Sequence, residues 1–157
     1  MHNHKPHYHG SRINPDSLIE SVQKLSKARG ERMTDVRRDV LVILSQLTKP
    51  HSAYQILAEL NKKRTQTLSA MSLYRTLNFL IDLGIVIKLE SQNAYQLCIE
   101  QDNDHSHLLL ICDTCGTVYE VTVQVASKKL QALAKQHGYI LKHHAVELHG
   151  SCAKCVA

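Results

Sequence analysis

The chain has 157 residues, of which 43% are hydrophobic and 21% are charged, and its net charge is +5. This size allows one domain or two small ones, and the composition excludes fibrous and disordered proteins. No apolar run approaches the ~18 residues that a membrane helix needs, and the His-rich start over residues 1–10 is unlike a secretory signal. We therefore expect a cytoplasmic protein without a membrane segment, whose five cysteines do not form disulfides.

The two halves of the chain differ in charge and in cysteine content. Residues 1–92 contain 14 Lys and Arg against 8 Asp and Glu, whereas residues 93–157 contain 5 against 6 and hold all five cysteines. A basic half suits nucleic acid, although an excess of this size is often only a solvated surface. We expect a flexible His-rich tail over residues 1–15, a DNA-binding domain over 16–98 and a dimerisation and metal-binding domain over 99–157.

Apolar residues that recur at helical spacing predict three helices in the first part of the basic half. The first is expected over residues 16–29. Thr34 can cap a second helix, which Pro50 closes. Ser52 and Gln55 form a capping box at the start of a third helix.

A fourth helix, expected over about residues 69–83 and ending at Gly84, has two contrasting faces. One face carries Leu73, Leu77, Leu80 and Ile81, and the other carries Arg75, Asn78 and Asp82, with Tyr74 at the margin. Arg can make paired hydrogen bonds to guanine, and Asn to adenine, so the polar face suits the major groove of DNA. An ordinary amphipathic surface helix would show the same pattern.

Two β-prone runs follow the fourth helix directly, over residues 85–89 and 94–98, and they flank a polar turn. This pattern predicts a β-hairpin. Helices followed by a hairpin are the order of elements in a winged helix-turn-helix domain. The order therefore favours DNA binding more strongly than the charge does.

Two Cys-x-x-Cys pairs stand in the second half, Cys112 with Cys115 and Cys152 with Cys155. Two residues between cysteines allow both thiolates to reach one ion around a tight turn. Two such pairs supply a closed tetrahedral set, which is typical of a structural zinc site. A thioredoxin-like redox motif would use a single pair beside a βαβ unit, which the sequence does not show.

The elements around these pairs predict a small sheet with one helix. Strands are expected over residues 107–111, 118–123 and 139–148, and a helix over 126–137. About sixty residues make a thin core, so we expect the metal to contribute much of the stability of this half. An exposed strand edge would suit dimerisation.

Cys98 is a fifth thiol that belongs to neither pair. His105 and His107 share one face of an extended segment, and Glu120 lies on the next predicted strand. Cys, His and Glu together suit zinc, and the thiol favours zinc over manganese or iron(II). The four residues predict a second metal site, although each of them taken singly could be an ordinary core or surface side chain.

The motifs resemble those of the ferric uptake regulator family of metal-responsive repressors. The matching segments run in uninterrupted order from about residue 20 to the end: Met33-Thr34-Asp-Val-Arg37, Ser72-Leu73-Tyr74-Arg75-Thr76-Leu77, His107 to Glu120, and Gly138-Tyr139 to Cys155. The segments 93–98 and 138–155 are most similar to the zinc uptake regulator branch. The resemblance implies an α+β protein with an N-terminal winged helix-turn-helix domain and a small C-terminal α/β dimerisation domain that holds a four-cysteine zinc site.

The resemblance also implies a function. It predicts a zinc-responsive repressor of zinc uptake and homeostasis genes, which binds double-stranded operator DNA as a metal-loaded homodimer. It places Tyr74 and Arg75 on the helix that enters the major groove, and Ser72 and Asn78 of the same helix complete the expected DNA-binding residues. It assigns structural zinc to the four paired cysteines.

One ligand of the sensing site departs from the pattern of the zinc branch. The resemblance assigns three ligands, Cys98, His105 and Glu120. The fourth is often a His in the first wing strand, where this chain has Ile87. His107 is the replacement we favour. His51 is the second candidate, one place from the hinge His of iron- and peroxide-sensing relatives, where Pro50 stands here.

Two further groups of histidines have weaker support. His143 and His144 match histidines of related sites, but Ser127 stands where the resemblance implies an acidic ligand of an accessory site. The tail histidines, His2, His4, His7 and His9, could scavenge zinc weakly or belong to a disordered end without a role.

Three other functions compete with a zinc-responsive repressor. An iron or peroxide sensor would have the same fold, and a zinc ribbon could bind protein alone. A zinc hydrolase or deaminase is the third, but deaminases pair His-x-Glu with Pro-Cys-x-x-Cys. Neither cysteine pair here follows a proline, no His-x-Glu occurs, and four sulfur ligands leave no position for an activated water. We therefore do not expect an enzyme.

Overall fold

The computed structural model describes residues 13–98, 106–121, 124–141 and 144–156. The chain divides after Cys98 into two compact units. In these described ranges, no helix combines the length and the apolar character that spanning a membrane requires.

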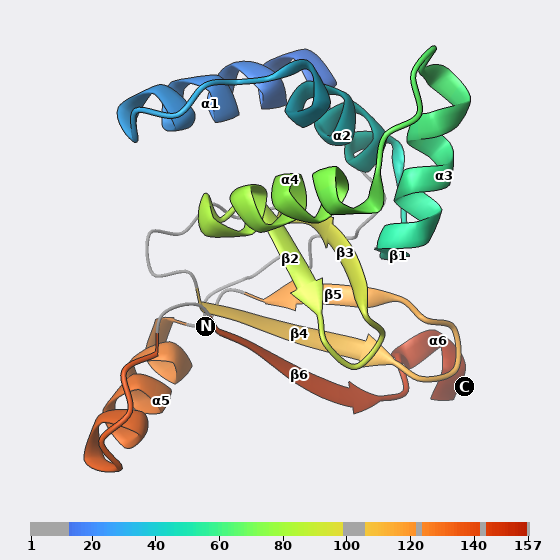
Figure 1. The fold of residues 1–157 in the computed structure, drawn as a ribbon. Helices are drawn as coiled ribbons and strands as arrows, with labels where there is room; N and C mark the ends of the chain where they lie inside the picture. The colour runs from blue at the N-terminus through green and yellow to red at the C-terminus, as the bar shows by residue number, and fades with distance from the viewer. Residues whose placement is uncertain (1–12, 99–105, 122–123, 142–143, 157) are drawn as a thin grey trace. The chain divides into compact units, whose positions relative to one another are not determined.

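The described part of the first unit contains four helices and a three-stranded sheet (Figure 1). The helices are α1 (Pro15–Ala28), α2 (Asp35–Gln46), α3 (Ala53–Lys63) and α4 (Ala70–Asp82), and the strands are β1 (His51–Ser52), β2 (Val86–Leu89) and β3 (Ala94–Leu97). The central strand β3 pairs antiparallel with both β1 and β2. This is the predicted winged helix-turn-helix architecture, to which the short strand β1 adds a third strand that the sequence pattern did not predict.

The predicted capping residues mark the starts of α2 and α3, but α2 ends at Gln46, before the Pro50 that was expected to close it, because Leu47 already adopts an extended conformation. Thr34 Oγ1 accepts a hydrogen bond from the Arg37 N–H at 3.3 Å and caps α2. Ser52 and Gln55 form the capping box of α3, in which each side chain accepts a hydrogen bond from the backbone N–H of the other residue. After α4, Gly84 adopts φ +72°, a left-handed conformation that costs glycine little.

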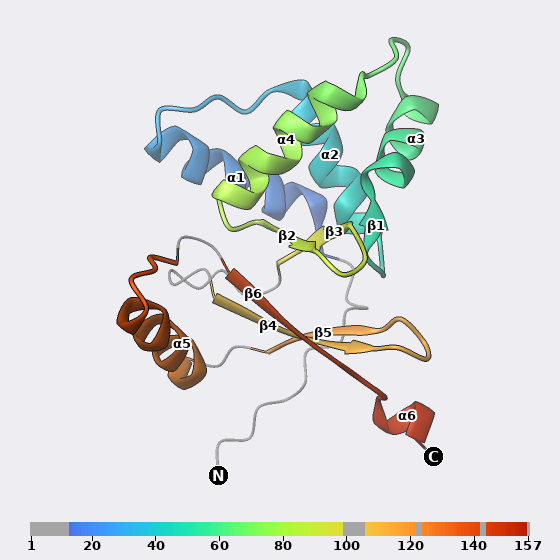
Figure 2. The same ribbon diagram turned by 60° about the horizontal axis from the view of Figure 1, so that its bottom comes forward.

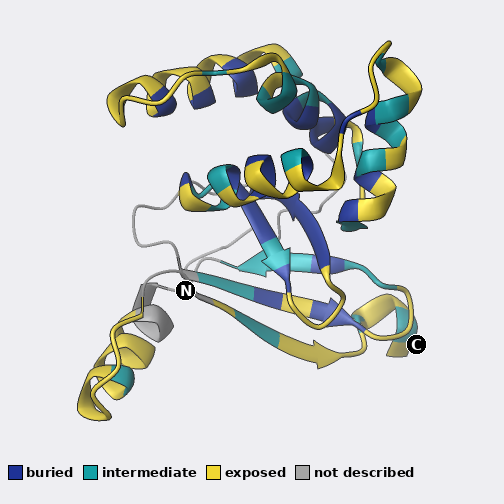
Figure 3. Cartoon of the chain, viewed as in Figure 1, coloured by how far each residue is buried: buried dark blue, intermediate teal, exposed yellow. Residues whose placement is uncertain are grey.

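The core of the first unit lies between the helices and one face of the wing sheet (Figure 3). The predicted apolar face of α4 is buried, with Leu73, Leu77 and Leu80 fully inaccessible to solvent and Ile81 packed at the edge of the core. Tyr95 of β3 packs into the same core. The position of α4 is therefore fixed by its buried face, which leaves its opposite face exposed.

The described part of the second unit contains three strands and two helices (Figure 2). They are β4 (Ser106–Cys112), β5 (Val118–Val121), α5 (Gln124–Gln136), β6 (His144–Gly150) and α6 (Ala153–Val156). The strand order is β5-β4-β6, and β4 runs antiparallel to β5 and parallel to β6. The last two residues of the predicted strand 118–123 lie outside the described residues.

Two features of the second unit differ from the prediction. Residues 139–141 are not part of a strand, although a strand was expected from Tyr139. The Tyr139 N–H instead donates to the Ala134 carbonyl at 2.9 Å and closes α5 behind Gly138, so β6 begins later. The short helix α6, which carries Cys155, was not predicted.

Candidate metal centre and nucleic-acid interface

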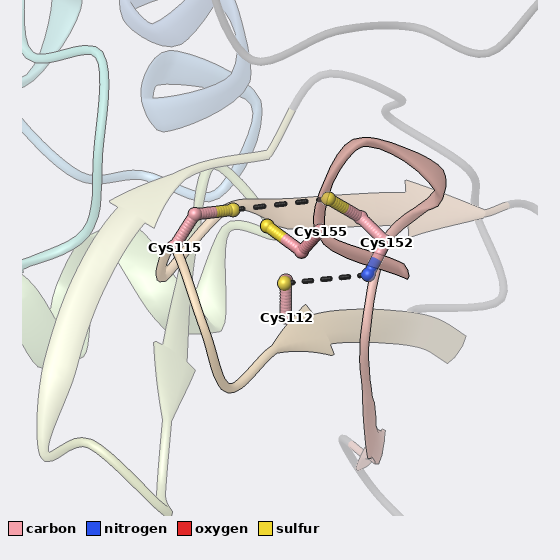
Figure 4. Close-up of side chains that lie close together, drawn as sticks. All are labelled: Cys112, Cys115, Cys152 and Cys155. Atoms are coloured by element: carbon pink, nitrogen blue, oxygen red, sulfur yellow. Dashed lines mark hydrogen bonds between the residues drawn. The ribbon is translucent and has the colours of Figure 1, made fainter. Parts of the chain in front are cut away.

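The four paired cysteines come together at one end of the sheet in the second unit (Figure 4). Cys112 is the last residue of β4, Cys115 lies in the following turn, Cys152 precedes α6 and Cys155 lies within it. All four sulfur atoms lie within 4.8 Å of one another. The parallel pairing of β4 with β6 ends at Cys112 and Gly150, and this register brings the second pair beside the first.

Backbone hydrogen bonds shape the two turns that present the thiols. The Gly116 N–H donates to the Cys112 carbonyl at 2.8 Å, and the Cys155 N–H donates to the Cys152 carbonyl at 2.8 Å. Gly116 has φ +69°, and an added Cβ would contact nothing within 4 Å. Glycine is therefore required there by the backbone conformation and not by lack of space.

The electrostatics of the cluster favour deprotonation of the first pair. The Cys152 N–H donates to Cys112 Sγ at 3.3 Å, and this bond, with a second from the Cys115 N–H, lowers the pKa of Cys112 to about 6. The Thr117 hydroxyl, 3.1 Å from Cys115 Sγ, lowers the pKa of Cys115. Hydrogen bonding of the Cys155 thiol to the Cys152 side chain raises the pKa of Cys155 to about 12.

This donor set fits zinc. Cys115 Sγ and Cys152 Sγ lie 3.9 Å apart, close to the separation of two sulfurs that share one tetrahedral ion. The protons held among the sulfurs would leave when a cation binds, because metal ligation requires thiolates. Four thiolates complete the tetrahedron and leave no open position, so the centre can stabilise the fold but cannot activate water.

A pair of residues that sequence reasoning missed holds the first turn against β6. The Asp113 N–H donates to the Gly150 carbonyl at 2.9 Å, and the Asp113 carboxylate lies 2.8 Å from His149 Nδ1. Glu147 is 3.8 Å from the other imidazole nitrogen of His149. No local pattern could reveal these contacts, because they depend on the register that places Ile111 opposite His149.

We expect Asp113→Ala to release the structural metal faster, because the turn that carries Cys112 and Cys115 loses its side-chain contact with β6. Partners beyond the ligands typically change metal affinity by 10- to 100-fold, and we expect about 10-fold here because His149 is not itself a ligand. The measurement is the rate of zinc transfer to excess chelator. The control is Glu147→Gln. Equal rates of zinc release from the wild-type protein, Asp113→Ala and Glu147→Gln would contradict a role for Asp113.

The candidate regulatory residues are divided between the two units. His107 Nδ1 lies 2.7 Å from Glu120 Oε1, on neighbouring strands of the second unit. The Glu120 side chain is only 4% exposed, and a buried carboxylate requires a partner such as a cation or a hydrogen-bond donor. Cys98 follows β3 in the first unit, where its N–H donates to the Ile85 carbonyl at 2.8 Å. His105 lies outside the described residues, so the full set of four ligands stays a prediction.

The other histidine positions give little support to further ligands. Ile87 is a buried residue of β2 paired with Gln96, so this position of the wing offers no imidazole. His51 lies on β1, with its Nδ1 2.8 Å from the Lys49 carbonyl. His143 and the side chains of His144 and Ser127 lie outside the described residues.

The exposed face of α4 carries the candidate DNA-binding residues. Tyr74, Arg75 and Asn78 are exposed, opposite the buried leucines. Ser72 is half-buried, and its hydroxyl lies 3.0 Å from that of Ser69, which caps the helix. The Ser72 hydroxyl is therefore already engaged in the cap, whereas the Arg75 and Asn78 side chains face solvent.

A side chain of α2 contacts α4, and the sequence pattern did not predict this contact. The Arg37 guanidinium lies 3.3 Å from the centre of the Phe79 ring, donates to the Arg32 carbonyl at 2.6 Å and pairs with the Glu31 carboxylate at 3.2 Å. A cation above an aromatic ring is attracted by the ring's quadrupole. Arg37 thus links the start of α2 to the C-terminal half of α4 and helps to fix the orientation of the exposed face.

Comparison with known proteins gives a consistent result. Residues 28–149 match the sequence profile described as "Ferric uptake regulator family". The chain is 36% identical over 140 residues to the zinc uptake regulation protein of Escherichia coli strain K12, covering 88% of this chain and 81% of that protein. It is 26% identical over 144 residues to the ferric uptake regulation protein of Campylobacter jejuni, covering 89% of each. A solved zinc uptake regulator complexed with zinc and DNA superimposes with a TM-score of 0.81 at 34% identity, covering 92% of this chain and 96% of that chain.

Proposed function

The chain belongs to the ferric uptake regulator family, and on that premise we propose that it is a zinc-responsive repressor of zinc uptake and homeostasis genes. It binds double-stranded operator DNA as a metal-loaded homodimer. The observation that carries the choice of metal is the 36% identity to a zinc uptake regulation protein, against 26% to a ferric one. An iron- or peroxide-sensing repressor is therefore not favoured.

We assign distinct roles to the two parts of the chain. Residues 16–98 form the DNA-binding domain, and residues 99–157 form the dimerisation and metal-binding domain. Its DNA target places the protein in the cytoplasm. We propose no enzymatic activity, because Cys112, Cys115, Cys152 and Cys155 would hold zinc in a closed set that supplies stability only.

The regulatory zinc is assigned to Cys98, His105, His107 and Glu120. The thiol selects zinc over harder cations. His107 replaces the wing histidine of the zinc branch, because this chain has Ile87 at that position. Cys98 is the last residue of the first unit, whereas His107 and Glu120 lie on β4 and β5. Shared ligation would restrict the freedom between the units and so preorganise the dimer for DNA.

The geometry of DNA explains why such preorganisation matters, and the usual coupling between two binding sites gives the expected size of the effect. The two α4 helices of a dimer must reach half-sites that are about 34 Å apart, one turn of the duplex. Coupling between metal and DNA typically amounts to about 1–3 kcal/mol, which corresponds to a change in DNA affinity of about 5- to 150-fold. By linkage, DNA would tighten the binding of zinc by the same factor.

Metal content and DNA binding, measured together, test this proposal. The probe is the best-binding duplex that the zinc-loaded protein recovers from a random pool, titrated anaerobically with zinc, iron(II) and manganese(II). We expect zinc to induce binding at the lowest free concentration, with both a structural and a regulatory ion bound per chain. Binding that responds to iron(II) and not to zinc would overturn the proposal.

Sequence reading by α4 is assigned to Arg75 and Asn78, with Tyr74 and Ser72 on the same helix. We expect Arg75→Ala to lower specific affinity by about 5- to 150-fold, because one paired contact to guanine contributes about 1–3 kcal/mol of discrimination. Fluorescence anisotropy at fixed salt measures this loss. Zinc content should not change.

A matched control removes one positive charge elsewhere. Lys128 is an exposed residue of α5, and Lys128→Ala should weaken binding slightly and equally for all sequences. If Arg75→Ala behaved like this control, α4 would not be the helix that reads the bases.

A further inference from the structure

Met71 is a large apolar side chain that the first unit leaves in solvent. It is the second residue of α4 and is 63% exposed, whereas Leu73, two residues later, is fully buried. A single exposed apolar residue is common on protein surfaces, so exposure alone carries no argument. The position of Met71 on α4 is what distinguishes it.

Met71 lies at the centre of the exposed face of α4. At about 100° per residue, Arg75 and Asn78 lie within about 40° of it around the helix axis. Leu80 lies about 180° away, in the core. A groove that admits Arg75 and Asn78 would therefore also receive Met71, one turn closer to the N-terminus.

The first turn of α4 presents no other side chain that could reach into such a groove. Ala70 is exposed but too short to reach far from the helix, and Leu73 is buried. The Ser72 N–H donates to Ser69 Oγ at 3.2 Å, and the Ser72 hydroxyl lies 3.0 Å from the same atom. The cap thus fixes the backbone of this turn and engages Ser72, which leaves Met71 as the side chain that projects outward.

We infer that Met71 is a specificity residue that contacts the C5-methyl group of a thymine in the major groove. The inference rests on the proposed function, in which α4 enters that groove. N-terminal residues of recognition helices contact base edges, and the thymine methyl is the apolar group that the major groove displays. The unbranched methionine side chain adapts its shape to such a partner.

A thermodynamic cycle between the side chain and the methyl group tests the contact. The probe is the duplex selected from a random pool by zinc-loaded protein, in which each thymine of one half-site is replaced in turn by deoxyuridine. Wild-type protein should lose about fourfold in affinity at one position, the factor expected for one buried methyl group. Met71→Ala should show no further loss at that position, because the two changes remove the same contact.

Two more variants complete the design. Met71→Gln keeps the length of the side chain and should lose the preference for thymine over deoxyuridine while binding DNA. Leu25→Ala removes an exposed apolar residue of α1 and should leave the fourfold preference intact.

The outcomes separate this inference from the proposed function. Strong zinc-dependent binding in which no thymine is coupled to Met71 overturns the inference and leaves the repressor function standing. Failure of the zinc-loaded protein to select any duplex overturns both. Coupling at one thymine, absent in the Met71 variants and retained in Leu25→Ala, supports the inference.

Discussion

Replacing Cys98 with Ser is expected to abolish the zinc dependence of DNA binding while leaving a folded dimer. Serine is a poor zinc ligand, so the regulatory ion would be lost together with its coupling to DNA. DNA affinity in excess zinc should fall by about 5- to 150-fold, to that of protein without regulatory zinc. The backbone bond from residue 98 to the Ile85 carbonyl needs no sulfur and should persist.

The measurement is zinc per chain by elemental analysis, read alongside anisotropy with the selected duplex. His107→Ala should act in the same direction, whereas His51→Ala serves as the control and should retain the zinc response. A Cys98→Ser protein that still binds DNA in proportion to zinc would show that the regulatory site lies elsewhere. If the zinc response were lost in His51→Ala and kept in His107→Ala, the fourth ligand would be His51 and not His107.

Replacing Cys112 with Ser is expected to unfold the second unit. Among its described residues, the buried hydrophobic positions are few: Leu109, Ile111, Cys112 and Val118. Structural zinc sites contribute apparent binding free energies of about 10–16 kcal/mol in small domains, which a core of this size cannot replace. Cys112 also accepts the Cys152 N–H, so its loss separates the two turns.

Circular dichroism and size-exclusion chromatography measure this outcome. We expect loss of the structural zinc and of the dimer, while helices α1 to α4 persist because their core is separate. Ser151→Ala, at an exposed position next to Cys152, is the control and should keep both the metal and the dimer. A Cys112→Ser protein with an unchanged melting temperature would contradict the structural role of the centre.

Chelation should separate the two classes of zinc. A mild chelator is expected to remove the regulatory ion first, because the proposed site joins one thiolate of the first unit to a carboxylate and imidazoles of the second. The four-thiolate centre should release its ion slowly. This difference permits the DNA-binding measurements above to be made on folded protein that retains its structural zinc.

Local sequence signals predicted most of the helices and one metal centre. Thr34 and the Ser52–Gln55 box mark helix starts because a side chain satisfies backbone N–H groups only a few residues away. The exposed and buried faces of α4 followed from periodicity. The Cys-x-x-Cys spacing predicted which thiols would meet, since each pair lies within one turn.

Other parts of the fold depend on partners distant in the sequence. The short strand β1 exists because His51 and Ser52 pair with β3, far along the chain. The strand expected from Tyr139 begins later, because the backbone N–H of Tyr139 donates to the Ala134 carbonyl and closes α5. Neither result follows from the residue types of the segment, because backbone hydrogen bonds can form in more than one arrangement.

The sequence by itself therefore determined the family, the exposed face of α4 and the identity of the four thiols that meet, all of which follow from short-range spacing. Tertiary structure alone decided the parallel register of β4 with β6, which brings Cys152 to Cys112 and Asp113 to His149. It also decided that Arg37 rests on Phe79. The physical reason is that strand register and side-chain packing are set by the fit of distant segments, and a local pattern of residues does not encode that fit.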